Sequence, residues 1–489
     1  MGICRREFVG GLLGCVAGRY LHAANRPKLL VIVVLEQCRP DYLDPLQGQM
    51  TAGGFRKLLD KGAWYPDCRH LASSFTSTGL ATLATGAWPA QHGIVADSWY
   101  DRSSRTRIAA NDEALRATTV MSEAASDPRC NVSMVCLNPI HARLFAGTPK
   151  ADFYWMDERG QFQTNGESPF WLQPFNDRKS LEKLHDARWI IPGVKADAPA
   201  LRTLTFDPRH PEQFLELYKA SPFAQDALFD FASELIKGEG LGLKSALDVV
   251  CLLDGSMESL GYDTGARNPL MDQMVLQLDR RLDALLTQLS HSHGDTGFGL
   301  VLVGAHGAPE APTDPARGRM AVDGEALARR IDTALAARGL GRVEKYLYPF
   351  LYLDSGGFRD AEEIRKAAGR AALEHPAVTD YLTAEGASSA ENEWQRRFRN
   401  SFHPKRSGDV MLSYQPGYVE DFGQNRGISY GSLYNYDIRV PLCFYGPQFR
   451  SGIFDQTVEA VDVAPTLARI LGVAAPSSSM GRVLAEALA

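Results

Sequence analysis

Short apolar runs recur along the chain, and each ends in a polar or glycine-rich turn. The runs, rich in β-branched residues, cover residues 28–36, 132–137, 246–253, 299–303 and 440–445. Their length and their lack of alternation indicate strands that are buried on both faces. Helical runs lie between them, such as residues 269–289 and 461–471. This pattern predicts an α/β fold, with a mostly parallel central sheet and helices on both of its faces.

Two regions interrupt this rhythm. Residues 154–244 are rich in aromatic residues, prolines and mixed charge, and we interpret them as a cap insertion. Residues 312–408 hold two amphipathic helical runs, at 325–338 and 360–374. A strand-like run lies between them at 346–353. The second region is therefore expected to form a small α+β insertion.

The first 24 residues can be separated from the main domain, which we expect to cover residues 25–489. Arg5-Arg6, a short apolar run and the small residues Ala23 and Ala24 are typical of a bacterial twin-arginine export signal. The sequence therefore predicts a periplasmic or other extracytoplasmic location. A loose lipobox at residues 12–15 leaves a lipid-anchored form open, and a disordered basic tail is the alternative. No later run reaches the roughly 18 apolar residues that a membrane span needs.

The net charge and the cysteine spacing argue against a nucleic-acid-binding protein and a zinc-ribbon protein. The 489 residues carry a formal net charge of −6 without a basic block, which argues against nucleic acid as a partner. Of the eight cysteines, Cys4 and Cys15 lie in the predicted signal, and the remaining six lack the C-x-x-C spacing of a zinc ribbon. The content of 45% hydrophobic and 22% charged residues is typical of a globular protein.

The stretch richest in chemistry is SSFTSTGLATLATGAWPAQHGI at residues 73–94. Four hydroxyl residues precede its helical run of small residues: Ser74, Thr76, Ser77 and Thr78. Such residues ordinarily cap a helix, and the positive end of the helix dipole there also favours an anion. An ordinary helix cap and a nucleophile that faces an anionic substrate therefore both stay open.

Three polar residues stand at or just past the ends of predicted strands: Glu36, Glu258 and His306. In open α/β sheets, ligands bind at the carboxyl ends of the strands. We therefore expect these side chains to share one cleft. Solvated carboxylates and a hydrogen-bonded core histidine are the alternatives.

Taken in order, the segments resemble the alkaline phosphatase superfamily, and within it the bacterial single-threonine alkaline phosphatases and the type I phosphodiesterase/nucleotide pyrophosphatases. The resemblance rests on VVLEQCRPDYL and six later segments, that is, on residues 33–43, 75–94, 96–101, 255–265, 303–308, 427–446 and 460–473. It covers most of the chain after the predicted signal. It implies the α/β fold described above and a phosphate ester or other small anionic ligand.

The resemblance also implies a two-zinc phosphoryl-transfer site, in which two ions clamp the attacking and the leaving oxygen. At the first zinc, Thr76 occupies the nucleophile position and Glu36 replaces an aspartate. The family's Asp-His pair there is Ala305-His306, so one ligand is missing.

At the second zinc the departure is greater. Glu258 replaces an aspartate, whereas Tyr262 and Tyr430 stand where the family has two histidines. A phenol has a pKa near 10 and is a poor zinc ligand at neutral pH. We therefore expect this second site to be empty.

Two substrate contacts of the family are also changed. Asp97 falls where the family has an asparagine that contacts a phosphate oxygen. The turn after the third strand lacks the family's lysine and arginine, and His141 and Arg143 just beyond it are the candidates to replace them.

The remaining ligands favour one divalent metal ion, zinc or another, over two, and they also allow none. Glu36, Thr76 and His306 are the expected ligands, and Glu258 is a further candidate. Thr76 and Asp97 are the catalytic candidates, but Glu36, Asp97 and Glu258 near one hydroxyl would repel a phosphate dianion. Three hypotheses remain: a metal-poor pseudoenzyme with weak or no phosphatase activity, a one-metal phosphodiesterase or phosphatase with Thr76 as nucleophile, and a two-metal phosphatase with other ligands.

Overall fold

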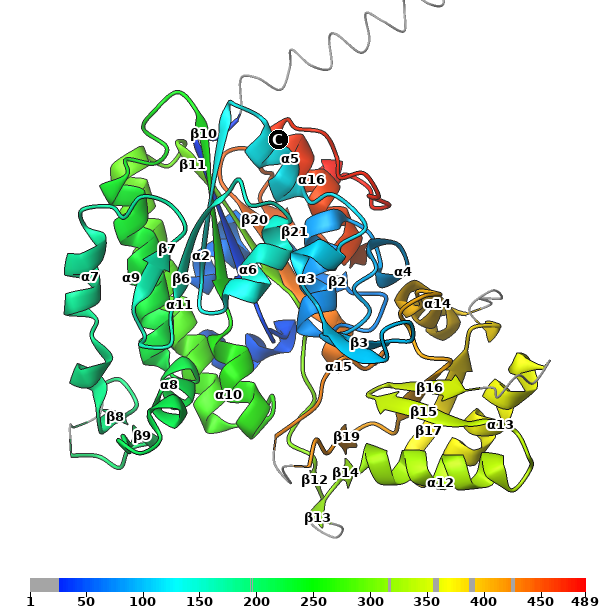
Figure 1. Ribbon diagram of the computed structural model, residues 1–489. Helices are drawn as coiled ribbons and strands as arrows, with labels where there is room; N and C mark the ends of the chain where they lie inside the picture. Colours follow the sequence, from blue (N-terminus) through cyan, green and yellow to red (C-terminus); the bar gives the residue numbers. More distant parts are fainter. Residues whose placement is uncertain are drawn as a thin grey trace, which may run out of the picture.

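The fold is built on one large sheet that runs through the molecule (Figure 1). The computed structural model describes residues 26–489 apart from 194, 196, 315–317, 355–359, 387–391 and 424–426, so the predicted export signal lies outside the described residues. In order across the sheet, the strands are β21 (Gly452–Ile453), β2 (Ala63–Arg69), β20 (Arg439–Tyr445), β11 (Phe298–Gly304), β1 (Leu29–Leu35), β10 (Leu247–Asp254), β5 (Cys130–Cys136), β6 (Asp152–Met156) and β7 (Phe162–Thr164), with β22 (Val458–Glu459) also paired to β2.

Most of this sheet is parallel. β11, β1, β10, β5 and β6 run in one direction, whereas β20 is antiparallel to β11 and to β2, and β7 is antiparallel to β6. The five apolar runs of the sequence all lie in it, which confirms the predicted mostly parallel central sheet.

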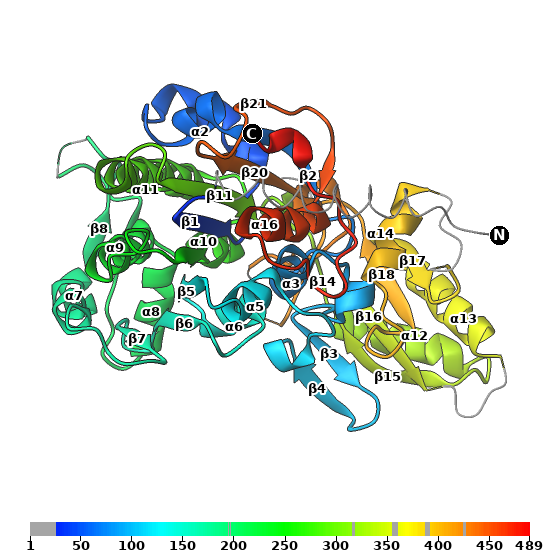
Figure 2. The same cartoon turned by 90° about the horizontal axis from the view of Figure 1, so that it is seen from above.

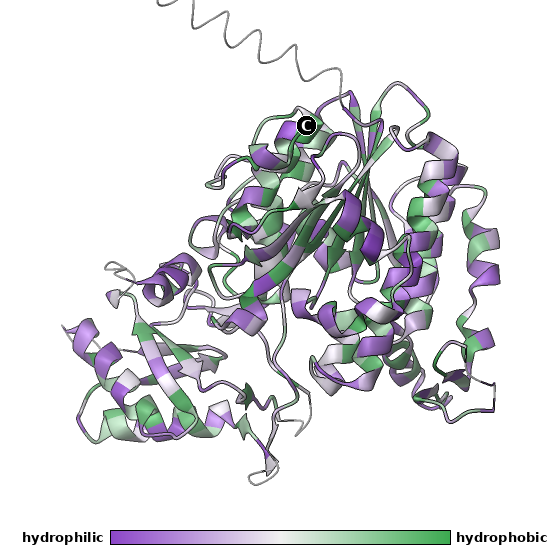
Figure 3. Cartoon of the chain, turned by 180° about the vertical axis from the view of Figure 1, so that it is seen from behind, coloured by the Kyte–Doolittle hydropathy of each residue, from purple (hydrophilic) through white to green (hydrophobic). Residues whose placement is uncertain are grey.

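Helices cover both faces of the sheet (Figures 1 and 2). One face carries α3 (Thr76–Thr85), α5 (Val120–Ser126), α6 (Pro139–Ala146) and α16 (Val463–Leu471), and the other carries α9 (Pro222–Gly238) and α11 (Pro269–His293). Alternate β1 side chains divide between the two cores: Ile32 and Val34 face the first group of helices, and Val31 and Val33 face the second. The uniformly apolar strands are visible in Figure 3, and burial on both faces is the reason for their composition.

The parallel register brings three strand ends to one edge. Leu35, the last residue of β1, lies beside Asp254 of β10 and Gly304 of β11. The residues that follow, Glu36, Gly255 and Ala305, therefore emerge side by side. This edge places the candidate site where open α/β sheets bind their ligands.

The region interpreted as a cap contains varied elements. After β6 and β7 come α7 (Leu172–Arg178), a short hairpin of β8 (Ala187–Trp189) and β9 (Arg202–Leu204), α8 (Pro211–Lys219) and α9. α9 packs in the core against the sheet, whereas α8 lies beside α10 (Ser256–Thr264).

The second inserted region forms a separate small sheet with the order β15-β16-β18-β17. Its strands are β15 (Arg342–Leu347), β16 (Phe350–Asp354), β17 (Val378–Thr383) and β18 (Val410–Tyr414), and α12 (Gly324–Ala336) and α13 (Ala361–Leu373) pack against them. Figure 1 shows this unit to one side of the main sheet.

Two details of this unit differ from the pattern in the sequence. The single strand expected at residues 346–353 is a tight hairpin, because Pro349 has no backbone N–H to continue a ladder. The unit also extends past the expected boundary at residue 408, since β18 pairs with both β16 and β17.

Two further features concern the described residues as a whole. No helix among the described residues is both apolar enough and long enough to span a membrane. The six cysteines outside the predicted signal are buried and free.

Candidate active site at the carboxyl edge of the sheet

Glu36 is the first side chain of the site. It follows β1 directly and is only 2% exposed. Gly255 gives it room, because a Cβ at that position would lie 2.7 Å from Glu36 Oε2. Burial raises the pKa of the Glu36 carboxyl, and the adjacent His141 opposes that rise. A buried carboxylate at this place therefore needs a positive partner.

His141 is that partner. Its Nδ1 lies 2.9 Å from Glu36 Oε1, and its Nε2 lies 3.3 Å from the amide nitrogen of Asn138. Asn138 also caps α6, because its Oδ1 accepts the Ile140 backbone N–H. Burial lowers the pKa of His141, but the Glu36 carboxylate outweighs it and the pKa rises to about 9. The imidazole is therefore held between a carboxylate and a helix cap. Arg143, which the sequence offers together with His141 as a replacement for the family's lysine and arginine, is exposed on α6.

Glu258 lies on the first turn of α10, beyond the end of β10. It accepts hydrogen bonds from the Thr76 hydroxyl and the Tyr430 phenol. Burial acts to raise the pKa of Glu258, but the nearby His141 and His306 reverse this and lower it. Glu258 therefore favours the carboxylate form and links the candidate nucleophile to the strand-end cluster.

Thr76 is the first residue of α3 and is 1% exposed. The expected hydroxyl caps do not form: Ser74 donates to the backbone oxygen of Asp437, and Thr78 to those of Ser73 and Phe75. The helix N-terminus is instead closed by Asp97, whose Oδ1 accepts the Ser77 backbone N–H at 2.9 Å. The Thr76 hydroxyl is therefore not used as a cap, and a carboxylate of the chain itself occupies the anion-binding end of α3.

His306 faces Thr76 from the turn after β11. Its Nε2 lies 3.0 Å from Thr76 Oγ1, and its Nδ1 lies 2.7 Å from the Gly307 carbonyl oxygen. Burial lowers the pKa of His306 and so favours the neutral ring. Because a carbonyl oxygen only accepts, Nδ1 carries the proton of that neutral ring and Nε2 offers a lone pair to the hydroxyl. Ala305, beside it, is fully buried and offers no ligand atom.

The two tyrosines at the former histidine positions line a cavity of about 930 Å³ between α8 and α10, with Glu258 in the same wall. Tyr430 also stacks on His306, with ring centroids 4.5 Å apart. Burial raises the pKa of the Tyr430 phenol well above its ordinary value, so the phenol stays protonated. Tyr262 stands one helical turn after Glu258 on α10. Neither position supplies a strong zinc ligand at neutral pH.

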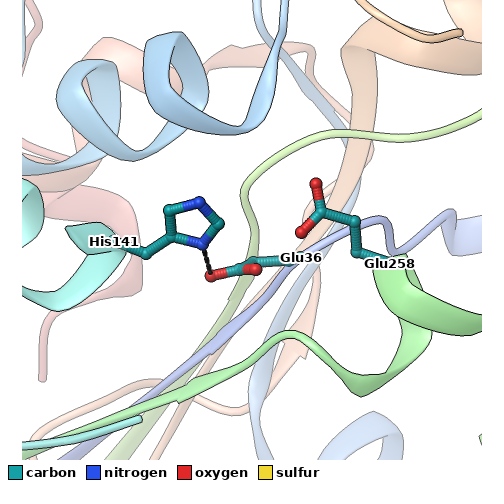
Figure 4. Close-up of side chains that lie close together, drawn as sticks. All are labelled: Glu36, His141 and Glu258. Atoms are coloured by element: carbon teal, nitrogen blue, oxygen red, sulfur yellow. Dashed lines mark hydrogen bonds and ion pairs between the residues drawn. The ribbon is translucent and has the colours of Figure 1, made fainter. Parts of the chain in front are cut away.

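One group of side chains has the arrangement of a metal site. Each of Glu36, His141 and Glu258 offers a ligand atom, and the three atoms lie within 4.8 Å of one another. Figure 4 shows the three side chains converging from the ends of β1, α6 and α10. The sequence placed Glu36 and Glu258 here but proposed His141 only as a substitute for a substrate contact. The position of His141 just after a predicted strand could have indicated this place. That strand, β5, ends at the same edge of the sheet, where its Cys136 pairs with Leu253 of β10.

Comparison with known proteins agrees with this architecture. The family model of type I phosphodiesterase/nucleotide pyrophosphatase matches residues 30–427. Alkaline phosphatase PhoV of Synechococcus elongatus is 24% identical over 95% of this chain and 93% of its own length. Alkaline phosphatase PafA of Elizabethkingia meningoseptica is 24% identical over 98% of this chain and 97% of its own length.

Solved structures show the same fold. The crystal structure of alkaline phosphatase PafA superposes with a TM-score of 0.83 at 21% identity, covering 95% of this chain and 99% of the other. Murine ectonucleotide pyrophosphatase/phosphodiesterase 5 has a TM-score of 0.58 at 15% identity, covering 91% and 95% of the two chains. This chain therefore belongs to the type I phosphodiesterase/nucleotide pyrophosphatase family of the alkaline phosphatase superfamily.

Proposed function

We propose that this protein is an exported phosphoesterase-type protein whose site is built on Thr76, that it holds at most one divalent metal ion, and that its phosphatase activity is weak or absent. The observation that carries this proposal is the hydrogen bond from Ser77 N–H to Asp97. It places a carboxylate at the helix end where an anionic substrate would be stabilised.

Electrostatics support weak binding of a phosphomonoester dianion. Glu258 accepts the Thr76 hydroxyl, and Glu36 lies next to Glu258. Asp97 lies at the N-terminus of α3, the helix that begins at Thr76. Each carboxylate repels a dianion, and the family's lysine and arginine have no counterpart in the turn Leu137-Asn138-Pro139. The charges at this site therefore favour a cation or a singly charged ester.

The donor set fits one metal ion but not two. Glu36 and Glu258 supply two carboxylates, and a histidine stands close to each of them. A second ion would have to rely on Tyr262, Tyr430 and the methyl group of Ala305. When bound, one divalent ion supplies a Lewis acid that polarises a phosphoryl oxygen.

A second candidate function is hydrolysis of phosphodiesters with Thr76 as nucleophile. It is favoured by two acceptors at the single Thr76 proton: the Glu258 carboxylate, to which the hydroxyl donates, and the lone pair of His306 Nε2, 3.0 Å away. Either one can take the proton when the oxygen attacks. The cavity of about 930 Å³ beside Glu258 offers space for the organic group of a diester. A diester also carries one negative charge rather than two. A relative of similar fold, murine ectonucleotide pyrophosphatase/phosphodiesterase 5, has been solved in complex with AMP.

Elemental analysis and hydrolysis assays test the proposal together. We expect at most one zinc ion per chain, and hydrolysis of nitrophenyl phosphate no faster than in Thr76→Ala. Diester hydrolysis that is lost in Thr76→Ala and kept in Thr76→Ser would establish the second candidate. Two zinc ions per chain, or rapid Thr76-dependent hydrolysis of the monoester, would contradict the proposed function.

Export is tested separately by cell fractionation. The location rests on Arg5-Arg6 and the apolar run that follows. Replacing both arginines with lysine should retain the protein in the cytoplasm of a bacterial host with a twin-arginine pathway. An unchanged location in that variant would exclude this route.

A further inference from the structure

We infer that His141, and not His306, supplies the nitrogen ligand of the single metal ion, which is held between Glu36, His141 and Glu258. This inference rests on the one-metal part of the proposed function. It differs from the ligand set implied by the resemblance, in which His306 and Thr76 hold the ion together with Glu36.

The spacing of the donor atoms is the first argument. Two ligands of one zinc ion, each about 2.0–2.2 Å from the metal, lie roughly 3–4 Å apart. His141 Nδ1 and Glu36 Oε1 are 2.9 Å apart. One potential ligand atom from each of Glu36, His141 and Glu258 lies within 4.8 Å of the other two. Small side-chain rotations therefore bring all three into coordination distance.

The second argument is that His306 faces Thr76 rather than Glu36. Nε2 lies against the Thr76 hydroxyl at 3.0 Å and Nδ1 against the Gly307 carbonyl at 2.7 Å. The ring also stacks on Tyr430. Its Nε2 lies 3.8 Å from Glu258 Oε1, but among the described residues it is His141 whose nitrogen lies within 4.8 Å of oxygens of both Glu36 and Glu258.

The third argument is that His141 is positioned before any ion arrives. It lies on the first turn of α6, which begins at Pro139 and is capped by Asn138. The Asn138 amide lies beside Nε2 of the ring, so Nδ1 is the nitrogen that faces the carboxylates.

Burial and charge fit a divalent cation. The side chains of Glu36, His141 and Glu258 are 3%, 15% and 15% exposed, so the two carboxylates meet largely out of water. A divalent ion balances both carboxylates and accepts a neutral imidazole. Mixed nitrogen and oxygen ligands suit zinc better than calcium or magnesium, which take mainly oxygen. Zinc is therefore the probe of choice.

The test is zinc binding to the full-length protein, measured by titration calorimetry after removal of metal with a chelator. His141→Gln is expected to weaken zinc binding by at least about 100-fold, since even outer partners of a ligand contribute about 10–100-fold. His306→Gln is expected to change the affinity little. His291→Gln, on the exposed end of α11, controls for nonspecific histidine effects. Circular dichroism checks that each variant is folded.

A crystal of the wild-type protein soaked in zinc gives an answer that needs no variant. Anomalous scattering should place the ion within coordination distance of His141 Nδ1. An ion bound by His306, loss of binding in His306→Gln but not in His141→Gln, or no zinc binding by the wild type would overturn the inference. The proposed weak phosphatase activity survives each of these results, because it is judged by hydrolysis in wild type and Thr76→Ala.

Discussion

Asp97 accepts the backbone N–H of Ser77 at 2.9 Å, and this contact closes the N-terminus of the helix that begins at Thr76. The N-terminus of a helix ordinarily attracts anions, because its free N–H groups point outward. Here the chain supplies its own anion beside the candidate nucleophile. A substrate phosphate would have to displace or approach a carboxylate.

Asp97→Asn is therefore expected to improve phosphate binding. The amide oxygen can still accept the Ser77 N–H, so the helix end stays closed while the negative charge is removed. Removing one charge a few ångströms from a dianion should tighten binding of inorganic phosphate about tenfold. Titration calorimetry with inorganic phosphate measures this change.

Asp101→Asn is a matched control for Asp97→Asn. Asp101 lies four residues away and bonds to Ser103 and Ser104 rather than to α3. It should leave phosphate binding unchanged. Equal effects of the two substitutions, or no effect of Asp97→Asn, would show that Asp97 does not control anion binding.

Introducing histidine at two positions beside Glu258 should increase the metal content. Tyr262 and Tyr430 line one cavity with Glu258, so Tyr262→His combined with Tyr430→His surrounds that carboxylate with two imidazoles. One carboxylate and two imidazoles form a known zinc-binding set. Elemental analysis should find about one more zinc ion per chain than in the wild type. Each single substitution is the control, and an unchanged zinc content in the double variant would contradict the assignment of these positions.

Much of the site followed from the strand ends. Glu36, Glu258 and His306 come directly after buried strands or at the first turn beyond them, and the parallel register brings them to one edge. The convergence of Glu258 and His306 on Thr76 was therefore predictable from apolar runs and the polar residues that end them.

Other features depended on choices between equivalent local partners. The hydroxyls of Ser74 and Thr78 could cap a helix or bond to a nearby carbonyl, and tertiary contacts favoured the carbonyl. His141 was ambiguous because its pairing with Glu36 depends on how α6 packs against β5. Likewise, the place of β18 in the small sheet could not be read from the local sequence, because its partners β16 and β17 lie far away along the chain. Local pattern does not encode these distant pairings.

Gly79→Ala tests how closely α3 is fixed to the sheet edge. A Cβ at Gly79 would lie 2.0 Å from the backbone oxygen of Ala305, next to His306. Alanine ordinarily stabilises a helix by about 1 kcal/mol over glycine, but here the clash should reverse the sign and cost about 1–3 kcal/mol. Urea denaturation measures the free energy of unfolding.

Gly48→Ala is the control for Gly79→Ala, since a Cβ added at Gly48 would have no neighbouring atom within 4 Å. It should leave stability nearly unchanged. If Gly79→Ala were as stable as the wild type, α3 could shift without cost, and the distance from Thr76 to His306 would not be fixed by this packing.

The stability of the small unit should depend on pH through Glu420. This buried carboxyl accepts hydrogen bonds from Tyr346 and Tyr414, each at 2.7 Å, while its own backbone N–H donates to Ser429 beside Tyr430. Burial raises its pKa from 4.5 to about 7, although the two tyrosines oppose the rise. Glu420 thus joins the small unit to the loop that carries a site residue.

The sign of the effect follows from proton uptake. Between pH 4.5 and about 7 the folded protein retains the Glu420 proton, whereas the unfolded chain releases it. Its contribution to stability is therefore complete below the unfolded pKa and is lost as the pH rises through about 7. Glu420→Gln stays neutral and still accepts a hydrogen bond, so its stability relative to the wild type should rise by roughly 2 kcal/mol from pH 5 to pH 8. Urea denaturation at both pH values measures this difference, with Glu374→Gln at the exposed end of α13 as the control. A difference between Glu420→Gln and the wild type that does not grow with pH would show that Glu420 is ionised in the folded protein, and that another group links this unit to pH.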